Sequence, residues 1–400
     1  MYTFPKSTWG LPLTASYSFG AETFDKEWRF LCACASPLLA AANFPASLTA
    51  ELNWNVTVEL ATAHGVLNLL SARLKETGFQ DIPAAARAEL QDRTRTQSLF
   101  TLSLTAELFR ILDEFRQAGI AAIPVKGPLV SLLAYGNPGM RNYADLDLLV
   151  RQQDILPASV LMRKLEFEAD VPEQAIRAGK IPGEYQFTRP GSQLIVELHT
   201  EDTLRYYPRP MRINDLFARQ RRVLLDGKEI PALRLEDEFL FDCIHGTKDF
   251  WERLVWAADI AAMVTRHPEL DWAILRQAAK DAGAGRMLYV ALALAESLLG
   301  VLVPAPMAEE VRKDAAARSL VRHIEAWMPG AGYAPPTLSK RAWFRWKVAG
   351  GGLAGAAFLL RLSLSTTEED WEATNEDRNS RLWEAVKRPF RLIRKYSQGG

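Results

Sequence analysis

Two aspartates one residue apart, Asp145 and Asp147, constrain this chain more than any other feature. The run from Leu146 to Val150 is apolar apart from Asp147 and is bounded by turn residues, which predicts a short buried strand. Residues i and i+2 of a strand project from one face, so we expect both carboxylates to point to the same place. Burying two like charges together is costly unless positive charge lies between them.

A hard divalent cation prefers carboxylate oxygens as ligands. The aspartate pair therefore indicates a magnesium site and, with it, phosphoryl or nucleotidyl chemistry. The alternative interpretation is a solvated strand entrance in which Asp145 caps a turn. An isolated Asp-x-Asp is a weak motif, so the surrounding residues have to distinguish the two interpretations.

The composition bounds the class of protein. With 400 residues, the chain is long enough for two or three domains with cores of their own. Basic and acidic residues number 48 each, so net charge draws the chain toward neither nucleic acid nor a membrane surface. Three cysteines cannot form a disulfide framework, and no run reaches the ~18 apolar residues of a membrane span. Residues 1–15 lack the apolar core of a signal peptide, so we expect a cytoplasmic protein.

Five regions follow one another along the chain. Residues 1–25 are polar and turn-rich and predict a loose N-terminal arm, whereas residues 26–118 predict helices that pack on the core. Residues 119–207 mix strand and helix patterns, and residues 208–330 return to helices. Residues 331–400 predict a linker and a charged amphipathic tail. The predicted fold class is therefore α+β, a small mixed β-sheet flanked by N-terminal and C-terminal helical regions.

The long helix before the core has recognisable ends. Asp81 and Pro83 suit a cap and a first helical turn, and Gly119 suits a C-terminal stop. Its apolar residues recur at spacings of three and four, which predicts one buried stripe. This stripe contains Leu104, Leu108, Ile111, Leu112 and Phe115.

Short strands are predicted inside the core region. Residues 120–125 form one of them, and Pro124 places it at a strand end or a sheet edge. Residues 128–135 predict a short helix that begins with proline. Residues 185–188 and 193–200 predict two strands, joined as a hairpin by residues 190–192.

A third carboxylate, Glu197, lies among apolar neighbours on the last of these strands. Strand alternation places Glu197 and His199 on the same face. If this strand pairs with the aspartate strand, Glu197 joins Asp145 and Asp147, and three carboxylates can hold two Mg²⁺ ions for an in-line displacement. The alternatives are an outward Glu197 on a half-exposed strand and a His199 that is a satisfied core group; in the functional interpretation its neutral imidazole orients a carboxylate or a metal-bound water.

Basic residues accompany the acidic pair. Lys126 and Gly127 end one strand and open a helix, where the lysine and backbone N–H groups can hold phosphates. Arg141 lies four residues before Asp145 and can reach the same phosphates with its guanidinium. The alternatives are a strand-end Lys126 that extends to solvent and an Arg141 in a surface salt bridge.

These residues resemble the uncharacterised nucleotidyltransferase family of the polymerase-beta superfamily, over roughly residues 95–265. Several spaced motifs occur in the expected order, which makes the resemblance fairly specific. The matching positions are Val125-Lys126-Gly127, Tyr135, Arg141-x-x-x-Asp145-Leu146-Asp147-Leu148-Leu149-Val150, Val196-Glu197-Leu198-His199, and His245, Trp251, Leu254, Trp256 and Asp259.

The resemblance implies a small mixed sheet and Mg²⁺-dependent transfer of a nucleoside monophosphate from an NTP to an acceptor hydroxyl. By this resemblance Asp145 and Asp147 bind both metals, and Glu197 completes the site and activates the acceptor. Lys126 and Gly127 replace the Gly-Ser pair that the superfamily more often has, and Gly127 is farther from Asp145 than the superfamily's compact spacing. Thr200 also stands where the family tends to have an aromatic residue.

His199 and two further residues are candidates for the nucleotide side of the site. His245 lies on a helical stripe with Lys248, and the resemblance supplies most of the support for a substrate-facing His245. Lys248 is a candidate phosphate partner. The alternative for His245 is a hydrogen bond on a helix surface.

Two C-terminal features carry weaker signals. Residues 350–355 match G-x-G-x-x-G, but no βαβ unit surrounds them, so a closely packed helix, or a short segment that rests against a membrane or a partner, is the better interpretation. Residues 378–395 are basic and amphipathic, which suits either a helix docked on its own domain or contact with membrane phosphates or an acidic partner.

The leading hypothesis is a nucleotidyltransferase whose acceptor is a small molecule, a peptide, a protein or a tRNA. The balanced charge argues against a large nucleic-acid acceptor, because phosphate contacts call for a basic surface. One alternative is a nucleotide-sensing or interaction module with the same fold and little turnover. Another is a peripheral-membrane partner protein that acts through its tail.

Overall fold

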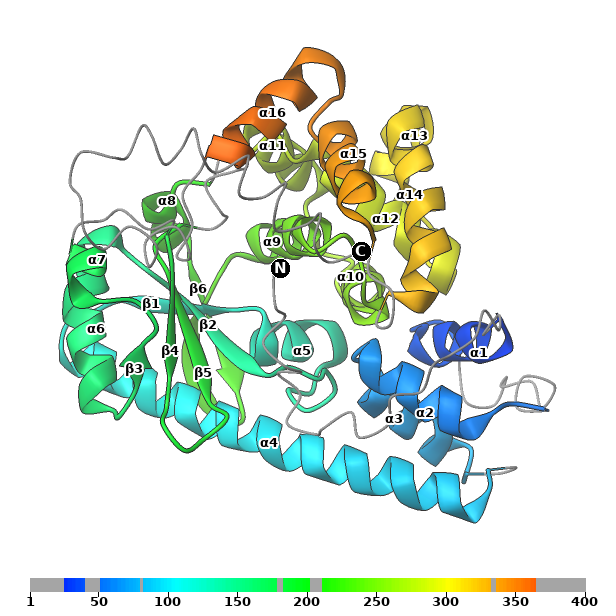
Figure 1. Ribbon diagram of the computed structural model, residues 1–400, viewed down its shortest axis with the longest axis horizontal. Helices are drawn as coiled ribbons and strands as arrows, with labels where there is room; N and C mark the ends of the chain where they lie inside the picture. Colours follow the sequence, from blue (N-terminus) through cyan, green and yellow to red (C-terminus); the bar gives the residue numbers. More distant parts are fainter. Residues whose placement is uncertain are drawn as a thin grey trace.

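The computed structural model describes residues 25–39, 51–79, 82–177, 183–201, 211–331 and 336–364 (Figure 1). A small sheet lies on one side of the molecule and most of the helices lie on the other, with α5, α9 and α10 between them. The predicted α+β class is confirmed. The N-terminal arm and the basic end of the tail fall outside the described residues.

The main sheet has five strands in the order β1-β2-β5-β4-β3. β2 and β5 are parallel, and the other neighbouring pairs are antiparallel, so the sheet is mixed as predicted. β1 is an edge strand, which explains how Pro124, without an N–H, is accommodated. The strand bounds are β1 (Ala122–Val125), β2 (Asp145–Val150), β3 (Glu168–Ala169), β4 (Glu184–Thr188) and β5 (Ile195–His199).

The register of β2 and β5 places the acidic residues side by side. Asp147 lies opposite Glu197 on β5 and opposite Val125 on β1. Leu146, Leu148 and Val150 point to the other face, where they pack in the apolar core beneath α4 and α6. β4 and β5 form the predicted hairpin.

Helix α4 (Ala84–Gln117) connects the sheet to the N-terminal helices along the length of the molecule (Figure 1). Its first half buries Ala86 and Leu90 in the helical core, and its second half buries Leu104 and Leu108 under the sheet. The predicted apolar stripe is thus confirmed. The helix is preceded by Pro83 and is followed by Gly119 at φ +73°, a conformation that glycine adopts without strain.

The N-terminal and C-terminal helices share one apolar core. Phe30 of α1, Leu60 of α2, Leu288 of α12 and Phe344 of α15 all belong to it. The helices other than α4 are α1 (Asp25–Ala35), α2 (Trp54–Ala63), α3 (Leu67–Glu76), α5 (Gly127–Tyr135), α6 (Ile155–Lys164), α7 (Glu173–Arg177), α8 (Ile213–Ala218), α9 (Leu235–Lys248), α10 (Leu254–Arg266), α11 (Trp272–Asp281), α12 (Gly285–Leu299), α13 (Ala305–Lys313), α14 (Ala315–Trp327), α15 (Leu338–Val348) and α16 (Gly352–Leu364).

The expectation that residues 208–330 are helical throughout was wrong. β6 (Arg221–Leu225) and β7 (Lys228–Ala232) form a two-stranded hairpin. Asp226 and Gly227 make its turn with φ values of +45° and +81°, and Asp-Gly is a favoured pair for such turns. β7 packs beside β1 and so helps to cover the edge of the main sheet.

The C-terminal segment begins as part of the folded body. Phe344 of α15 is fully buried against the helical core. The G-x-G-x-x-G sequence forms the turn between α15 and α16, and Trp346 lies against Gly355. A helix precedes these glycines rather than a strand, so the dinucleotide-binding context is absent from this segment. Within the described ranges, no helix combines the length and the apolarity needed to cross a membrane.

His64 joins the N-terminal helices to the C-terminal ones. Its ring is fully buried, and its Nδ1 accepts the backbone N–H of Leu254 at 3.3 Å. Nε2 therefore carries the proton and faces the carbonyl oxygen of Pro329 at 3.4 Å. Burial lowers the pKa of His64 from 6.5 to about 4, so the folded protein holds this ring neutral.

We predict that the free energy of unfolding of His64→Gln depends less on pH than that of the wild type. Below pH 6.5 the unfolded chain binds a proton at His64, whereas the folded chain binds it only near pH 4. Acidification across this window therefore lowers the free energy of unfolding by about 3 kcal/mol. The free energy of unfolding, measured in urea from pH 7 to pH 4, should fall less steeply in His64→Gln. His323→Gln, at an exposed position, is the control and should keep the wild-type slope. Equal slopes in all three proteins would contradict the assignment.

Candidate functional site

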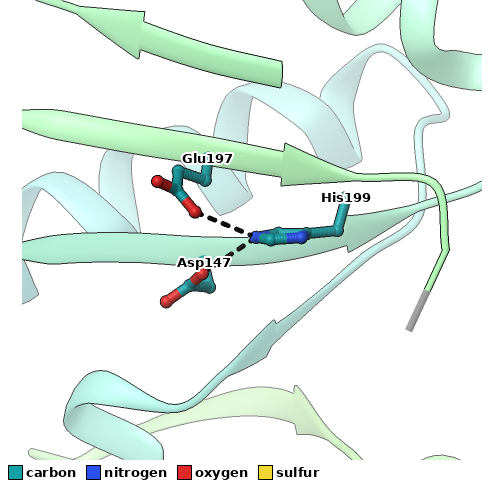
Figure 2. A group of neighbouring side chains, drawn as sticks. All are labelled: Asp147, Glu197 and His199. Atoms are coloured by element: carbon teal, nitrogen blue, oxygen red, sulfur yellow. Dashed lines mark hydrogen bonds and ion pairs between the residues drawn. The ribbon is translucent and has the colours of Figure 1, made fainter. Parts of the chain in front are cut away.

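Asp147, Glu197 and His199 meet on the face of the sheet that carries the aspartates (Figure 2). One potential ligand atom from each lies within 4.8 Å of those of the other two. Asp147 comes from β2 and the other two from β5, so the parallel pairing of these strands creates the cluster. The expected convergence of Asp147 and Glu197 is confirmed.

Asp147 is the most highly connected member of the cluster. Its Oδ1 accepts a hydrogen bond from Lys126 Nζ at 2.6 Å and another from His199 Nε2 at 2.8 Å. Its side chain is 2% exposed. Burial opposes its ionisation, but the charge of Lys126 and the hydrogen bond from His199 outweigh burial and hold the pKa of Asp147 below its usual range.

His199 is a charged donor between two carboxyl groups. Its Nε2 is 3.4 Å from Glu197 Oε2 as well as 2.8 Å from Asp147 Oδ1. Burial favours the neutral ring, but these hydrogen bonds outweigh burial and raise the pKa of His199 to about 9. The neutral imidazole expected from the sequence is therefore wrong, because His199 holds its second proton near neutral pH.

Glu197 is in a different electrostatic environment. Burial, followed by the charge of Glu184, raises the pKa of Glu197 to about 8. Glu184 lies on β4 and hydrogen-bonds Glu197, and Lys248 Nζ is 3.7 Å from its Oε1. Burial opposes ionisation of Glu184, yet Lys248 and His199 lower its pKa to about 2. The pair therefore retains one proton near neutral pH, and Glu197 holds it.

Asp145 stands apart from this cluster. It begins β2 on the same side as Asp147, but its oxygens are not within the 4.8 Å group. Burial and the charge of Asp147 raise its pKa. No hydrogen bond from the described part of the chain reaches its carboxylate. Asp145 thus offers a partly exposed carboxylate next to the cluster.

Lys126 has an unusual backbone. Its φ and ψ are +55° and −149°, a combination that costs a non-glycine residue about 1–3 kcal/mol. Glu238 of α9 accepts its backbone N–H at 3.1 Å. Gly127 follows at φ +40° and opens α5. The strand-to-helix turn expected from the sequence is present, and a buried carboxylate holds it in place.

Two carboxyl groups on α9 lie behind this turn. Glu238 Oε2 and Asp242 Oδ2 are buried and have no hydrogen-bond partner among the residues that the structure describes. Burial raises the pKa of Glu238 to about 7 and raises the pKa of Asp242 as well. Sequence analysis missed Glu238 and Asp242, because nothing in a helical pattern shows which strand the helix covers.

Arg141 is engaged inside the protein. Its Nε donates to Asp259 Oδ2 at 2.7 Å, and Tyr135 Oη donates to Asp259 Oδ1 at 2.8 Å. The side chains of Arg141 and Asp259 are 9% and 3% exposed. This ion pair connects α10 to the segment before β2.

His245 and Lys248 lie near the end of α9. The His245 ring meets Trp256 edge to face at 5.5 Å between centroids, and its Nδ1 is 3.5 Å from Asp249 Oδ2. Burial and then the charge of Lys126 lower the pKa of His245 well below its usual value, so this ring is neutral. Lys248 contacts the cluster through Glu184. Sequence analysis missed Glu184, because this residue precedes the predicted strand at residues 185–188.

The small mixed sheet presents carboxylates from two paired strands beside the lysine-glycine start of a helix. Residues 50–300 match a family described as uncharacterised nucleotidyltransferase, and the chain belongs to this family. The resemblance seen in the sequence is thus confirmed over a longer segment. No protein of curated function matches the chain.

One solved structure shows a limited similarity. It is an antigenic nucleotidyltransferase-like protein from Paracoccidioides brasiliensis, with 14% sequence identity and a TM-score of 0.28. The similarity covers 54% of this chain and 96% of that one.

We predict that Asp259→Asn destabilises the protein by about 3–5 kcal/mol, because it leaves the Arg141 guanidinium buried without a negative partner. Tyr135→Phe removes only a hydrogen bond to the same carboxylate and should cost about 1 kcal/mol. Urea unfolding monitored by circular dichroism measures both changes. An Asp259→Asn protein as stable as Tyr135→Phe would show that the ion pair does not support the fold.

Proposed function

We propose that this protein transfers a nucleoside monophosphate from an NTP to an acceptor hydroxyl and releases pyrophosphate, with Mg²⁺ as cofactor. The observation that supports this proposal most strongly is the largely buried cluster of Asp147, Glu197 and His199 beside Lys126. Family membership gives the general class of reaction. The substrate and the metal dependence are the parts that we add.

The donor set fits a hard divalent cation. Asp147 and Glu197 supply carboxylate oxygens close together, and Asp145 adds a carboxylate that no described residue bonds. We assign these three residues to hold two Mg²⁺ ions. When bound, Mg²⁺ supplies positive charge against the triphosphate and the reacting oxygens.

The protein's own groups prepare the acceptor. Glu197 is the candidate base, since it is partly exposed at 18% and belongs to the cluster. It is protonated near neutral pH in the ligand-free protein, and positive charge arriving with the nucleotide favours its ionised form. The ionised carboxylate can then accept the hydroxyl proton of the acceptor. His199 fixes the positions of Asp147 and Glu197 by hydrogen bonds to both.

We assign the nucleotide to the basic side of the site. Lys126 and the start of α5 at Gly127 suit phosphate oxygens, and Lys248 adds a second ammonium. Arg141 and His245 are assigned to the same side of the site. Arg141 contributes its positive charge there while it stays paired with Asp259. The acceptor stays open among a small molecule, a peptide, a protein and a tRNA, and we propose that the reaction is cytoplasmic.

One observation favours the alternative of a nucleotide-sensing module with little turnover. Lys126 already neutralises Asp147, the carboxylate that catalysis would need for metal. A lysine that never left this position would let the fold bind a nucleotide without transferring it.

We predict that wild-type protein labels an acceptor when it is incubated with α-labelled NTPs, Mg²⁺ and cell extract. The Asp145→Asn/Asp147→Asn variant should label it at least about a hundredfold more slowly, the effect expected when charge stabilisation of a transition state is lost. Asp281→Asn, an exposed position on α11, is the matched control and should label like wild type.

Equal labelling by wild type and the double variant would exclude the assigned carboxylates. Labelling by neither protein, together with retained nucleotide binding, would support the sensing module. Contact of the tail with membrane phosphates or an acidic partner is a separate proposal. Removal of residues 365–400 tests it by cell fractionation and spares Phe344 of α15, which is part of the helical core.

A further inference from the structure

Lys126 occupies the position of a counter-ion at the centre of the site. Its Nζ lies 2.6 Å from Asp147 Oδ1, and the two side chains are 11% and 2% exposed. Asp147 also accepts a hydrogen bond from His199 Nε2 at 2.8 Å. Asp147, the carboxylate best placed to bind a metal ion, is therefore already neutralised by a cation of the protein.

The backbone of Lys126 is held in place by a buried carboxylate, whereas its side chain has rotatable bonds of its own. Glu238 holds its N–H, and the strained φ of +55° aims the residue out of the end of β1 and into the start of α5. The four-carbon stem is flexible and ends in a compact charge. Lys126 thus pairs its ammonium with Asp147 and is also the residue directly before α5, whose first backbone N–H groups suit phosphate.

We propose that Lys126 is an exchangeable counter-ion, which neutralises Asp147 in the empty site and moves to the nucleotide's phosphates when a divalent cation takes Asp147. This inference rests on the proposed function and deepens it. Two cations repel each other at one carboxylate, so metal and lysine compete there. The phosphates give the displaced ammonium a new partner, and therefore nucleotide and metal favour each other's binding.

The first test measures Mn²⁺ binding to nucleotide-free protein by electron paramagnetic resonance. Lys126→Gln keeps a hydrogen-bond donor near Asp147 but removes the charge, so we expect it to bind Mn²⁺ at least tenfold more tightly than wild type. Lys126→Arg keeps the charge and should remain within about threefold of wild type. Lys228→Gln removes an equal charge from a half-exposed salt bridge with Asp113, outside the site, and should bind Mn²⁺ like wild type.

The second test is the reciprocal one and uses a different variant. Asp147→Asn frees Lys126, so in EDTA it should bind a nucleoside triphosphate with an uncleavable α,β-methylene link several-fold more tightly than wild type. Lys126→Gln/Asp147→Asn should lose that gain. Thermal melting checks that each variant is folded, and Mn²⁺ should raise the melting temperature of Lys126→Gln more than that of wild type.

The proposal is overturned if Lys126→Gln binds Mn²⁺ no more tightly than wild type. It is also overturned if Asp147→Asn binds the nucleoside triphosphate in EDTA no more tightly than wild type. Mn²⁺ that binds Lys126→Gln but never wild type, even with nucleotide, would make Lys126 a permanent replacement and also refute the exchange. The transfer assay is independent of these outcomes. Both binding results as expected, without transfer by wild type, would support the exchange and refute the proposed reaction.

Discussion

The parallel pairing of β2 with β5 is the constraint on which the site depends. It sets Asp147 opposite Glu197, and His199 follows two residues later on the same face. A shift of one residue in this register would send Glu197 and His199 to the face that packs against α4. Leu146, Leu148, Val196 and Leu198 prevent such a shift, because they fill the apolar core on that face. The apolar pattern of the strands thus also fixes the positions of the polar groups.

Charge balance then determines the state of the site. Asp147 is ionised because Lys126 and His199 lie against it, whereas burial and the neighbouring charge of Glu184 raise the pKa of Glu197 so that it holds a proton. The cluster thus contains both a permanent anion and a carboxyl group that can lose its proton when positive charge arrives. Such a site is suited to a ligand that brings cations with it, as an NTP does.

Much of the core was predictable because its signals are local. The apolar stripe of α4, the edge position of Pro124 and the hairpin of β4 and β5 follow from periodicity and turn residues. The β6–β7 hairpin was missed although Asp226-Gly227 marks its turn, because strongly helical segments follow it. Glu184 and Glu238 were missed for another reason, since their roles arise only where β4 and α9 pack beside the cluster.

The sequence by itself determined the family, the strands that carry the acidic residues and the face on which Glu197 and His199 lie. Alternation along a strand and the order of motifs contain that information. Only the tertiary structure decided which charges meet. It paired Lys126 with Asp147, paired Arg141 with Asp259 and protonated His199. The partner and the burial of a charged group depend on segments far apart in the chain, and these two quantities set its pKa and its chemistry.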